Sequence, residues 1–397
     1  MNKVIPYGRQ NISAADIQAV TETLQSDFLT QGPKIAEFEN NFSNYIGSKY
    51  AVAVSNGTAA LHLCALALGV KQGQKVITTP ITFAASANCV RYCDGEVVFA
   101  DIDPDTYLLD LVSVRKLLEA SPKGTYSGII PVDFAGRAVD MEAFRLLATE
   151  YGLWIIEDSC HAPGGFFKDT NNVIQNCGNG QFADLAIFSF HPVKHIACGE
   201  GGMITTNDEE LYKKLLVLRT HGITREAEML ENSISFAAAD ESATKYPNWY
   251  MEMQELGFNY RLTDFQAALG ISQLKRADDG LVRRRIIAEK YAAEFKGKAF
   301  VKGQSGLVEG HAYHLYVLEV EDRLGLYNYL RENKIFAQIH YIPCHLMPYY
   351  KKFGWKEGDM PNAETYYKRC ISLPMFPTLT DADHEFVMAK INAYYHG

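Results

Sequence analysis

Between residue 50 and about residue 220, short apolar runs alternate with segments whose apolar residues recur at helical spacing. The apolar runs are residues 50–54, 75–79, 96–101, 128–133, 153–157, 185–190 and 202–205. Helical spacing occurs between them, for example at residues 111–120 and 141–151. This alternation predicts an α/β fold with a mainly parallel seven-stranded sheet and helices on both faces. Ligands of such sheets bind in loops at the carboxyl ends of the strands.

The segments on either side of this alternation predict further helices and a smaller domain. Ser13 would cap a first helix, and apolar residues at helical spacing from Ile35 to Tyr45 indicate a second. Residues 223–257 are polar and poorly patterned, which is typical of a long excursion. Later elements are expected at 262–277, 282–295, 313–319, 324–333 and 336–340. In a chain of 397 residues, these patterns predict a large domain at 1–270 and a smaller α+β domain at 271–397.

Charge and hydropathy argue against some classes of protein. A net charge of -9 and a pI near 5.7 argue against binding nucleic acid by bulk attraction. No apolar run approaches the roughly 20 residues that span a bilayer, and the first residues lack the apolar run of a signal peptide. We therefore expect a cytoplasmic protein without a membrane partner. The eight cysteines are scattered without CxxC pairs, so neither disulfides nor a metal site is expected.

A lysine and a cluster of glycines follow one of the predicted strands. Residues 189–194 read SFHPVK, and residues 199–202 read GEGG. Lys194 would stand at the carboxyl end of a strand, where packing among apolar groups can lower the pKa of a lysine and make its amine a nucleophile. A single lysine is more often a solvated surface residue, so this motif alone leaves both interpretations open.

Two acids end the predicted strand at 153–157. Glu157 and Asp158 stand there, and His161 follows three residues later. A carboxylate at this point could keep a pyridinium nitrogen protonated, which makes the ring of a cofactor an electron sink. Judged in isolation, Asp158 could equally cap a helix or stand in a turn, and His161 could be a structural histidine.

Small polar residues between a predicted strand and a predicted helix form a third element. Residues 55–60 read SNGTAA, and free backbone N–H groups at a helix start make a suitable phosphate cradle. Phe83, at the start of the next helix, could stack on a flat ring, although core packing is the commoner fate of a single phenylalanine. In this order on a parallel sheet, a phosphate loop, an aromatic ring, a strand-end aspartate and a lysine describe a site for pyridoxal 5′-phosphate (PLP).

The chain resembles the DegT/StrS-type nucleotide-sugar aminotransferases, which are PLP enzymes of fold type I, over nearly its whole length. The motifs that carry the resemblance are LTQG at 29–32, SNGT at 55–58, ED at 157–158, SF at 189–190 with Lys194, GEGG at 199–202, RTHG at 219–222, GFNYR at 257–261 with Gln266, and HY at 340–341 with Pro343. Within the family it is most similar to the transaminases of pseudaminic acid biosynthesis. In this family, C4-aminating members carry histidine at the position of His191, where C3-aminating members usually carry tyrosine.

The resemblance implies a role for each of these residues. Lys194 would form a Schiff base with PLP and later move the proton, while Asp158 would pair with the pyridine nitrogen. The other cofactor-binding residues would be Gly57, Thr58, Phe83, His161, Ser189 and Asn259. Of these, Asn259 would reach the phosphate of the neighbouring subunit. The substrate-binding residues would be Tyr7, Leu29, Thr30, Asn56, His191, Gln338, His340 and Tyr341.

The implied activity moves an amino group from glutamate to C4 of a UDP-linked 4-keto-6-deoxy-N-acetylhexosamine. The kinetics would be ping-pong, with pyridoxamine 5′-phosphate as the intermediate form, in a homodimer whose active sites lie at the subunit interface. Within the family, amination at C3, a sugar of another configuration, or a sugar dehydratase are the alternatives, although a dehydratase would carry histidine in place of Lys194. Two further alternatives are a short-chain dehydrogenase and a non-enzymatic relative that keeps the fold. Residues 45–49 match the YxxxK pattern of such dehydrogenases, but no GxGxxG loop precedes them.

Overall fold

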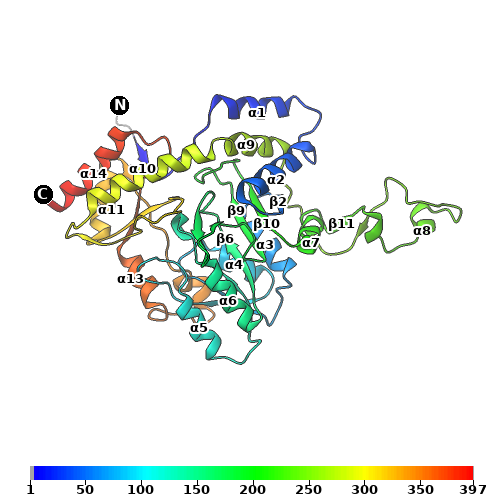
Figure 1. Cartoon of the computed structure of the whole chain (residues 1–397), viewed down its shortest axis with the longest axis horizontal. Coiled ribbons are helices and arrows are strands. Elements are labelled where there is room, and N and C mark those ends of the chain that lie inside the picture. The colour runs from blue at the N-terminus through cyan, green and yellow to red at the C-terminus, as the bar shows by residue number, and fades with distance from the viewer. Residues whose placement is uncertain (1–3, 397) are drawn as a thin grey trace.

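A computed structural model of the chain describes residues 4–396, and its centre is a seven-stranded sheet (Figure 1). The sheet has the order β2-β10-β9-β6-β5-β3-β4. Its strands are β2 (Tyr50–Val54), β3 (Lys75–Thr78), β4 (Glu96–Phe99), β5 (Tyr126–Ile130), β6 (Trp154–Asp158), β9 (Leu185–Ser189) and β10 (Gly202–Thr206). Strand β10 is antiparallel to both of its neighbours, and the other neighbouring pairs are parallel. The predicted fold class and all seven predicted strands are confirmed.

Six of the seven strand ends differ from the prediction by one to three residues, and the differences at β5 and β6 have a local cause. Strand β5 ends at Ile130 rather than at residue 133, because Pro131 has no N–H to continue the ladder. Strand β6 extends one residue further, to Asp158, whose N–H donates to the carbonyl of Pro131 at 2.9 Å. This extension fixes the backbone of Asp158 at the edge of the sheet.

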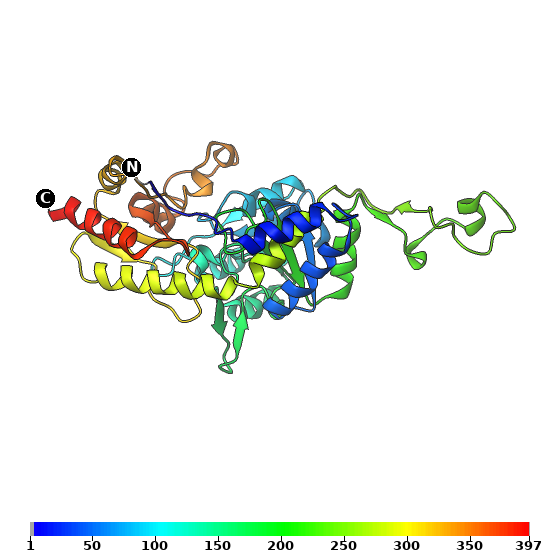
Figure 2. The same ribbon diagram turned by 90° about the horizontal axis from the view of Figure 1, so that it is seen from above.

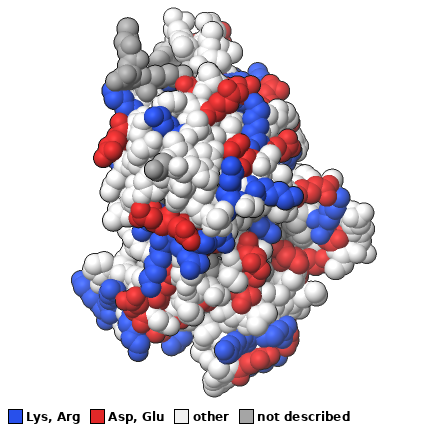
Figure 3. Space-filling model, turned by 90° about the vertical axis from the view of Figure 1, so that its left-hand side faces the viewer, with Lys and Arg blue, Asp and Glu red and all other residues white. Residues whose placement is uncertain are grey.

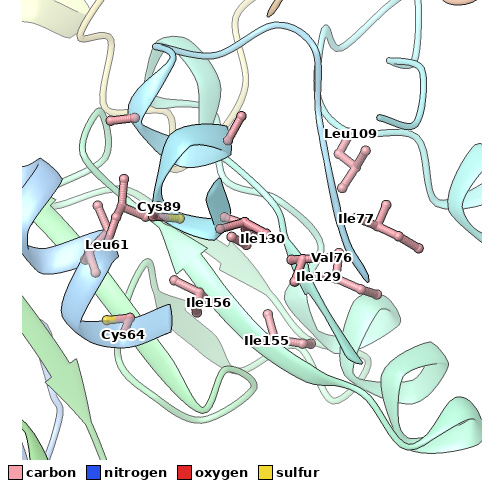
Figure 4. Close-up of a cluster of buried hydrophobic side chains, with 14 of the residues drawn as sticks. Leu61, Cys64, Val76, Ile77, Cys89, Leu109, Ile129, Ile130, Ile155 and Ile156 are labelled. Atoms are coloured by element: carbon pink, nitrogen blue, oxygen red, sulfur yellow. The ribbon is translucent and has the colours of Figure 1, made fainter. Parts of the chain in front are cut away.

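Helices cover the sheet on both faces, as the alternation of patterns predicts. They are α3 (Gly57–Ala67), α4 (Ala85–Tyr92), α5 (Leu111–Glu119), α6 (Met141–Tyr151) and α7 (Glu209–Arg219). Figure 4 shows Ile77, Ile129 and Ile155, which come from three adjacent strands and are fully buried under these helices. Burying each such side chain contributes about 1.5–3 kcal/mol to folding. The apolar strands therefore anchor the loops that follow them.

The N-terminal helices pack on a helix from later in the chain. Helix α1 (Ala14–Leu24) begins with a capping box at Ser13, and α2 (Pro33–Ile46) follows. Both helices lie against α9 (Asp264–Leu274), which ends near the start of α10 (Ala277–Phe295). The predicted starts of these two later helices were therefore wrong by a few residues, most clearly for α10.

The C-terminal part of the chain builds a small antiparallel sheet with helices and has an apolar core of its own (Figure 2). The sheet consists of β13 (Val301–Gln304), β14 (Tyr316–Val320) and β16 (Cys370–Leu373). The helices are α10, α11 (Arg323–Glu332), α12 (Pro348–Lys351), α13 (Pro361–Arg369) and α14 (Asp381–His396). Cys344, Tyr350 and Tyr366 pack instead into the core of the large sheet. The domain division at about residue 270 stays a prediction.

The regular element expected at 336–340 is mostly absent. Only Ile335–Phe336 forms a strand, β15, which pairs with β1 (Ile5–Pro6). Gln338 then makes one isolated bridge with Ser372, and the chain continues without regular structure toward His340 and Tyr341. This irregular path carries the last two residues to the wall of the pocket that is described below.

Residues 223–257 form an arm that projects away from the body of the molecule (Figures 1 and 2). It contains β11 (Ile223–Thr224), η2 (Ala227–Met229), α8 (Ile234–Ala238) and β12 (Glu252–Met253), with β11 and β12 paired antiparallel. Gly222 lies so close to the base of the returning strand that a Cβ atom there would stand 1.7 Å from the carbonyl oxygen of Glu255. The predicted excursion is thus an ordered hairpin-like projection. A second short hairpin consists of β7 (Phe166–Lys168) and β8 (Ile174–Asn176).

Basic and acidic side chains alternate on the face drawn in Figure 3, where no continuous basic strip is visible. Within residues 4–396, no helix combines the length and the apolar character that a membrane crossing requires. The signal-peptide prediction concerned the first residues, of which 1–3 lie outside the described part of the chain.

Candidate active site

One cavity of about 740 Å³ opens at the edge of the sheet where β2, β6 and β9 end. Twelve of the residues predicted for the site line it. They are Tyr7, Asn56, Gly57, Thr58, Phe83, Asp158, His161, Ser189, His191, Lys194, His340 and Tyr341. Segments far apart in the sequence therefore meet around one space, as the parallel sheet predicts.

Asp158 is buried at the last position of β6, and both of its carboxylate oxygens have donors. Oδ2 accepts a hydrogen bond from the Ser86 hydroxyl at 2.7 Å, and Oδ1 accepts one from the Cys160 N–H at 3.1 Å. Donors to both oxygens hold the carboxylate in one orientation. The geometry therefore excludes the helix-cap interpretation of Asp158, because its side chain faces the pocket.

Lys194 stands five residues after the end of β9, in a tight loop closed by a hydrogen bond from its N–H to the His191 carbonyl at 2.8 Å. Desolvation by burial lowers the pKa of its ammonium, and nearby Arg284 acts in the same direction, whereas Cys160 and Asp158 oppose the shift. A lowered pKa increases the fraction of neutral amine, which is the nucleophilic form. Lys194 is half-buried and lines the cavity, so it is not a solvated surface lysine.

The start of α3 forms a cradle for an anion. Asn56 caps the helix by accepting from the N–H of Ala59 at 2.8 Å, and Gly57 and Thr58 in the first turn line the cavity. A Cβ atom on Gly57 would lie 3.0 Å from the Cβ of Ser189, so a larger residue would crowd the Ser189 side chain. Free N–H groups and the positive end of the helix dipole favour a phosphate at this point.

Phe83 is 64% exposed, and its ring lines the cavity 6.4 Å from the ring of Tyr341. It precedes α4, which starts at Ala85 rather than at Phe83. A phenylalanine of the hydrophobic core would be buried, so the structure excludes the core-packing interpretation. An open aromatic face beside Asp158 is suited to stacking on a flat ring.

The hydrogen bonds of His161 determine which of its nitrogens carries the proton. The Ala135 N–H donates to Nδ1 at 3.2 Å, so Nδ1 must be an acceptor. Burial lowers the pKa of His161 well below its ordinary value, and the positive charge of Lys194 adds to the shift. The neutral ring therefore carries its proton on Nε2, which lies 3.3 Å from the Tyr341 hydroxyl oxygen.

Four predicted site residues lie outside the cavity wall that residues 4–396 build: Leu29, Thr30, Asn259 and Gln338. Thr30 bridges Thr263, Asn259 bridges Thr220, and Gln338 bridges Ser372. The structure also adds residues to which the sequence analysis gave no role, namely Ser86, Cys160, His314, and Glu200 and Tyr260 from the GEGG and GFNYR motifs. Cys160 was within reach of prediction because it stands between Asp158 and His161, but the sequence gives no signal for Ser86 or His314.

The fold and the pocket together define a class of enzyme. An oriented carboxylate, a lysine of lowered pKa, an anion cradle and an exposed aromatic ring face one cavity at the carboxyl edge of a mainly parallel sheet. These groups fit PLP, since the cofactor offers a phosphate, a flat ring, a ring nitrogen and an aldehyde. The class is that of the PLP-dependent aminotransferases.

The comparison with protein families agrees with this class. The sequence model of the DegT/DnrJ/EryC1/StrS aminotransferase family matches residues 10–392, and the chain belongs to that family. It is 39% identical to the spore coat polysaccharide biosynthesis protein SpsC of Bacillus subtilis, covering 100% of this chain and 98% of the relative. It is 35% identical to the UDP-4-amino-4,6-dideoxy-N-acetyl-beta-L-altrosamine transaminase of Campylobacter jejuni, covering 97% and 96% of the two chains.

Solved structures show the same fold. Helicobacter pylori PseC, an aminotransferase involved in the biosynthesis of pseudoaminic acid, superposes with a TM-score of 0.85 at 28% identity and covers 99% of each chain. The PLP-form of Spr1654 from Streptococcus pneumoniae, described as a sugar aminotransferase, has a TM-score of 0.85 at 28% identity and covers 99% and 98% of the two chains. The chain is thus a PLP-dependent aminotransferase of this family.

Proposed function

We propose that the protein transfers an amino group from glutamate to C4 of a UDP-linked 4-keto-6-deoxy-N-acetylhexosamine, as in pseudaminic acid biosynthesis. The observation that carries the reaction type is the placement of Lys194 and Asp158 in one cavity with the anion cradle at Gly57. The choice of sugar is supported by the names of the C. jejuni and H. pylori relatives and by His191 at the pocket.

Each residue then has a defined task. When bound, PLP supplies an electron sink for the charge left on carbon when a proton is removed. Lys194 would bind the cofactor through Nζ and, once displaced by the amino donor, would move a proton as the neutral amine that its surroundings favour. Asp158 would hold the proton on the ring nitrogen, and the Ser86 hydroxyl would keep the Asp158 carboxylate oriented toward it.

A homodimer would account for three of the four predicted residues outside the cavity. Thr30 and Asn259 adjoin Thr263 and Thr220, near a second cavity of about 280 Å³ that Arg219 and Arg261 line. We propose that Leu29, Thr30 and Asn259 complete the site of a second copy of the chain, with Asn259 at its phosphate. Gln338 instead lies beside its own pocket, since it bridges Ser372, whose hydroxyl oxygen lies 2.9 Å from Nδ1 of His340. We further propose that this dimer works in the cytoplasm, where nucleotide sugars would be its substrates.

The alternatives inside the family differ in their product. A different sugar is favoured by one observation: SpsC, which is named for spore coat polysaccharide biosynthesis, has a higher identity to this chain than the C. jejuni enzyme has. Amination at C3 is the other alternative. A dehydratase is disfavoured because Lys194 occupies the position where such relatives carry histidine.

The first test is the absorption spectrum of the purified protein with PLP, before and after addition of glutamate. We expect a visible band that glutamate bleaches. Lys194→Ala should lose this bleaching and at least about a thousandfold in turnover, because the proton carrier is gone. Substantial turnover by this variant would refute the assigned role of Lys194, and the absence of any band in the wild type would refute the cofactor site.

The second test identifies the sugar. The glutamate-treated enzyme is incubated with the UDP-linked 4-keto-6-deoxy-N-acetylhexosamine, and the product is analysed by NMR. An amine at C4 is the expected result. An amine at C3, or a deoxygenated product without nitrogen, would replace the proposed substrate or reaction by one of the alternatives.

A further inference from the structure

If the proposed function holds, the part of the pocket beside Lys194 must accept in turn a dicarboxylic amino donor and the uncharged ring of a UDP-linked sugar. Among the described residues that line it, the charged side chains are Asp158, Lys194 and Glu200, and none is an arginine. A dicarboxylic amino donor brings two carboxylates, whereas the ring of a keto sugar is neutral. A buried arginine that pairs with the donor would be left unpaired when the sugar binds, which is unfavourable. Neutral hydrogen-bonding groups avoid this conflict.

His314 is a neutral group of this kind. It stands just before β14, is 4% exposed, and lines the cavity. Its ring packs on that of His161, with 4.3 Å between ring centroids and 33° between ring planes. Burial lowers the pKa of His314 well below its ordinary value, and the charge of Lys194 adds to the shift, so the ring is neutral at neutral pH.

The backbone around His314 is held firmly, whereas its ring nitrogens are not. The buried Arg284 donates to the His314 carbonyl at 3.2 Å, and the Leu315 N–H donates to the Ala135 carbonyl at 3.1 Å. Yet Nδ1 of His314 is buried without a hydrogen-bond partner within residues 4–396. A buried polar atom without a partner is unfavourable and calls for a ligand or another explanation.

The two other buried histidines of the pocket are constrained in a way that His314 is not. Nδ1 of His161 accepts from the Ala135 N–H, which fixes its tautomer. Nδ1 of His340 lies 2.9 Å from the Ser372 hydroxyl. Within residues 4–396 no group forms a hydrogen bond with Nδ1 of His314, so no such bond fixes whether that nitrogen carries the proton. Because Nδ1 is sealed from the cavity, a ligand would meet Nε2, which can then either donate or accept a hydrogen bond.

We propose that His314 is a substrate-binding residue for both half-reactions, donating a hydrogen bond to a carboxylate oxygen of the amino donor and accepting one from a hydroxyl of the sugar. The change of tautomer lets one neutral ring serve an anion and a polyol in turn. The inference rests on the proposed function and names a residue of the same pocket that recognises both substrates.

The test measures binding without turnover. Glutarate, a dicarboxylate that has no amino group to transfer, is titrated by calorimetry into the PLP-loaded enzyme. His314→Phe keeps a ring against His161 but removes both nitrogens, and we expect glutarate affinity to fall about tenfold or more. His314→Gln retains a donor and an acceptor and should bind glutarate within a few-fold of the wild type. In single-turnover experiments, His314→Phe should slow both the glutamate and the sugar half-reaction.

His311→Phe is the matched control, because it removes a buried imidazole from the same segment. His311 packs on Tyr313 and accepts from the Tyr313 N–H at 2.9 Å, and it does not line the cavity. This variant should lower thermal stability and leave glutarate affinity unchanged. Should His314→Phe fail to fold, the comparison is made with His314→Leu and His314→Gln at the same temperature.

The outcomes separate this inference from the function on which it rests. Equal glutarate affinity in the wild type and His314→Phe would overturn the role of His314 and leave the aminotransferase assignment intact. A defect confined to one half-reaction would overturn its dual use. If the wild type neither bound glutarate nor was bleached by glutamate, the proposed amino donor and the role of His314 would both be wrong.

Discussion

The sheet-edge half of the pocket and its C-terminal half are built in different ways. The sheet-edge half consists of Gly57, Asp158 and Lys194, each within five residues of a strand of the central sheet. The C-terminal half consists of His314, His340 and Tyr341, which stand on segments without regular structure. Rigid strand ends suit groups that must be placed precisely for chemistry, and irregular segments suit groups that meet a variable substrate. This contrast predicts that changes in the first half lower kcat, whereas changes in the second half raise KM.

Asp158→Asn should have the largest effect of the changes that sharpen this contrast. We expect kcat to fall about 10²–10⁴-fold with little change in KM, because an amide cannot hold the proton on the ring nitrogen. The affinity for PLP, measured by titration of the visible band, should change much less than kcat. Steady-state kinetics with both substrates provide the check.

Ser86→Ala is the graded control for that change. It removes the 2.7 Å hydrogen bond to Oδ2 of Asp158 but keeps the carboxylate and its bond from the Cys160 N–H. A loss of about tenfold in kcat is expected, since one hydrogen bond to a charged group is removed. A wild-type kcat in Asp158→Asn would contradict the assignment of this half of the pocket to the chemistry.

The sheet-edge half could be predicted from the sequence because local patterns determine it. An apolar run ends at Asp158, a second ends shortly before Lys194, and small residues at Gly57 open a helix. Parallel strands bring their carboxyl ends to one edge, so local patterns were enough to place these residues together. The seven strands of the sheet were predictable for the same reason.

The C-terminal half could be named only by resemblance, and His314 was missed altogether. The position of His314 depends on Arg284 and Ala135, which contact its segment across distant parts of the chain. The partner of Asp158, Ser86, lies 72 residues away in the sequence. Such contacts come from tertiary packing, which periodicity does not encode. Residues 337–340 were expected to be part of a regular element, but the chain follows an irregular path there toward the pocket.

Tyr341→Phe should have a smaller effect than Asp158→Asn, and it should change KM rather than kcat. His161 donates from Nε2 to the Tyr341 oxygen, so the Tyr341 hydroxyl hydrogen is left to donate into the cavity. Removing this donor should raise the KM of one substrate about tenfold and leave kcat within a few-fold of the wild type. Steady-state kinetics with glutamate and with the keto sugar would identify which substrate receives the bond.

If Tyr341→Phe lowered kcat at unchanged KM, the assignment of the C-terminal half to substrate binding would be contradicted. Tyr350→Phe is a suitable control, since its hydroxyl donates to Asn88 at 2.7 Å in the core rather than into the pocket. That control should lower stability by about 1 kcal/mol without changing either KM.

The smallest expected effect is on stability, and it involves two carboxyl groups that are buried beneath the sheet-edge half of the pocket. Asp133 and Glu157 are buried beside each other, with Ser159 donating to Asp133 at 2.8 Å and the Gly178 N–H donating to Glu157 at 2.9 Å. Burial raises the pKa of both groups, well above the ordinary value for Glu157, and the negative charge of Asp133 adds to the shift of Glu157. The pair therefore keeps a proton in the folded state that an unfolded chain would release.

Because the folded state retains this proton, the direction in which the free energy of unfolding changes with pH can be predicted. Above about pH 4.5 the unfolded chain holds fewer protons than the folded one, so the free energy of unfolding should fall as pH rises, by up to about 1.4 kcal/mol per pH unit and per proton. The fall should end where the folded pair itself loses its proton. Glu157→Gln cannot titrate but can still donate to Asp133, so its stability should decline less between pH 4.5 and 7 in urea unfolding.

In the same experiment, Glu364→Gln should change the pH dependence of the free energy of unfolding in the opposite direction. Burial alone would raise the pKa of Glu364, but hydrogen bonds from His345 and from the Gly358 N–H outweigh it and lower the pKa. Its contribution to stability is therefore present above the ordinary carboxyl pKa and is lost as the pH falls through its lowered value. Relative to the wild type, Glu157→Gln should gain stability as pH rises, whereas Glu364→Gln should lose it. Parallel profiles for the two variants would contradict a proton held between Asp133 and Glu157, and kcat should not follow either profile, because neither carboxyl group lines the cavity.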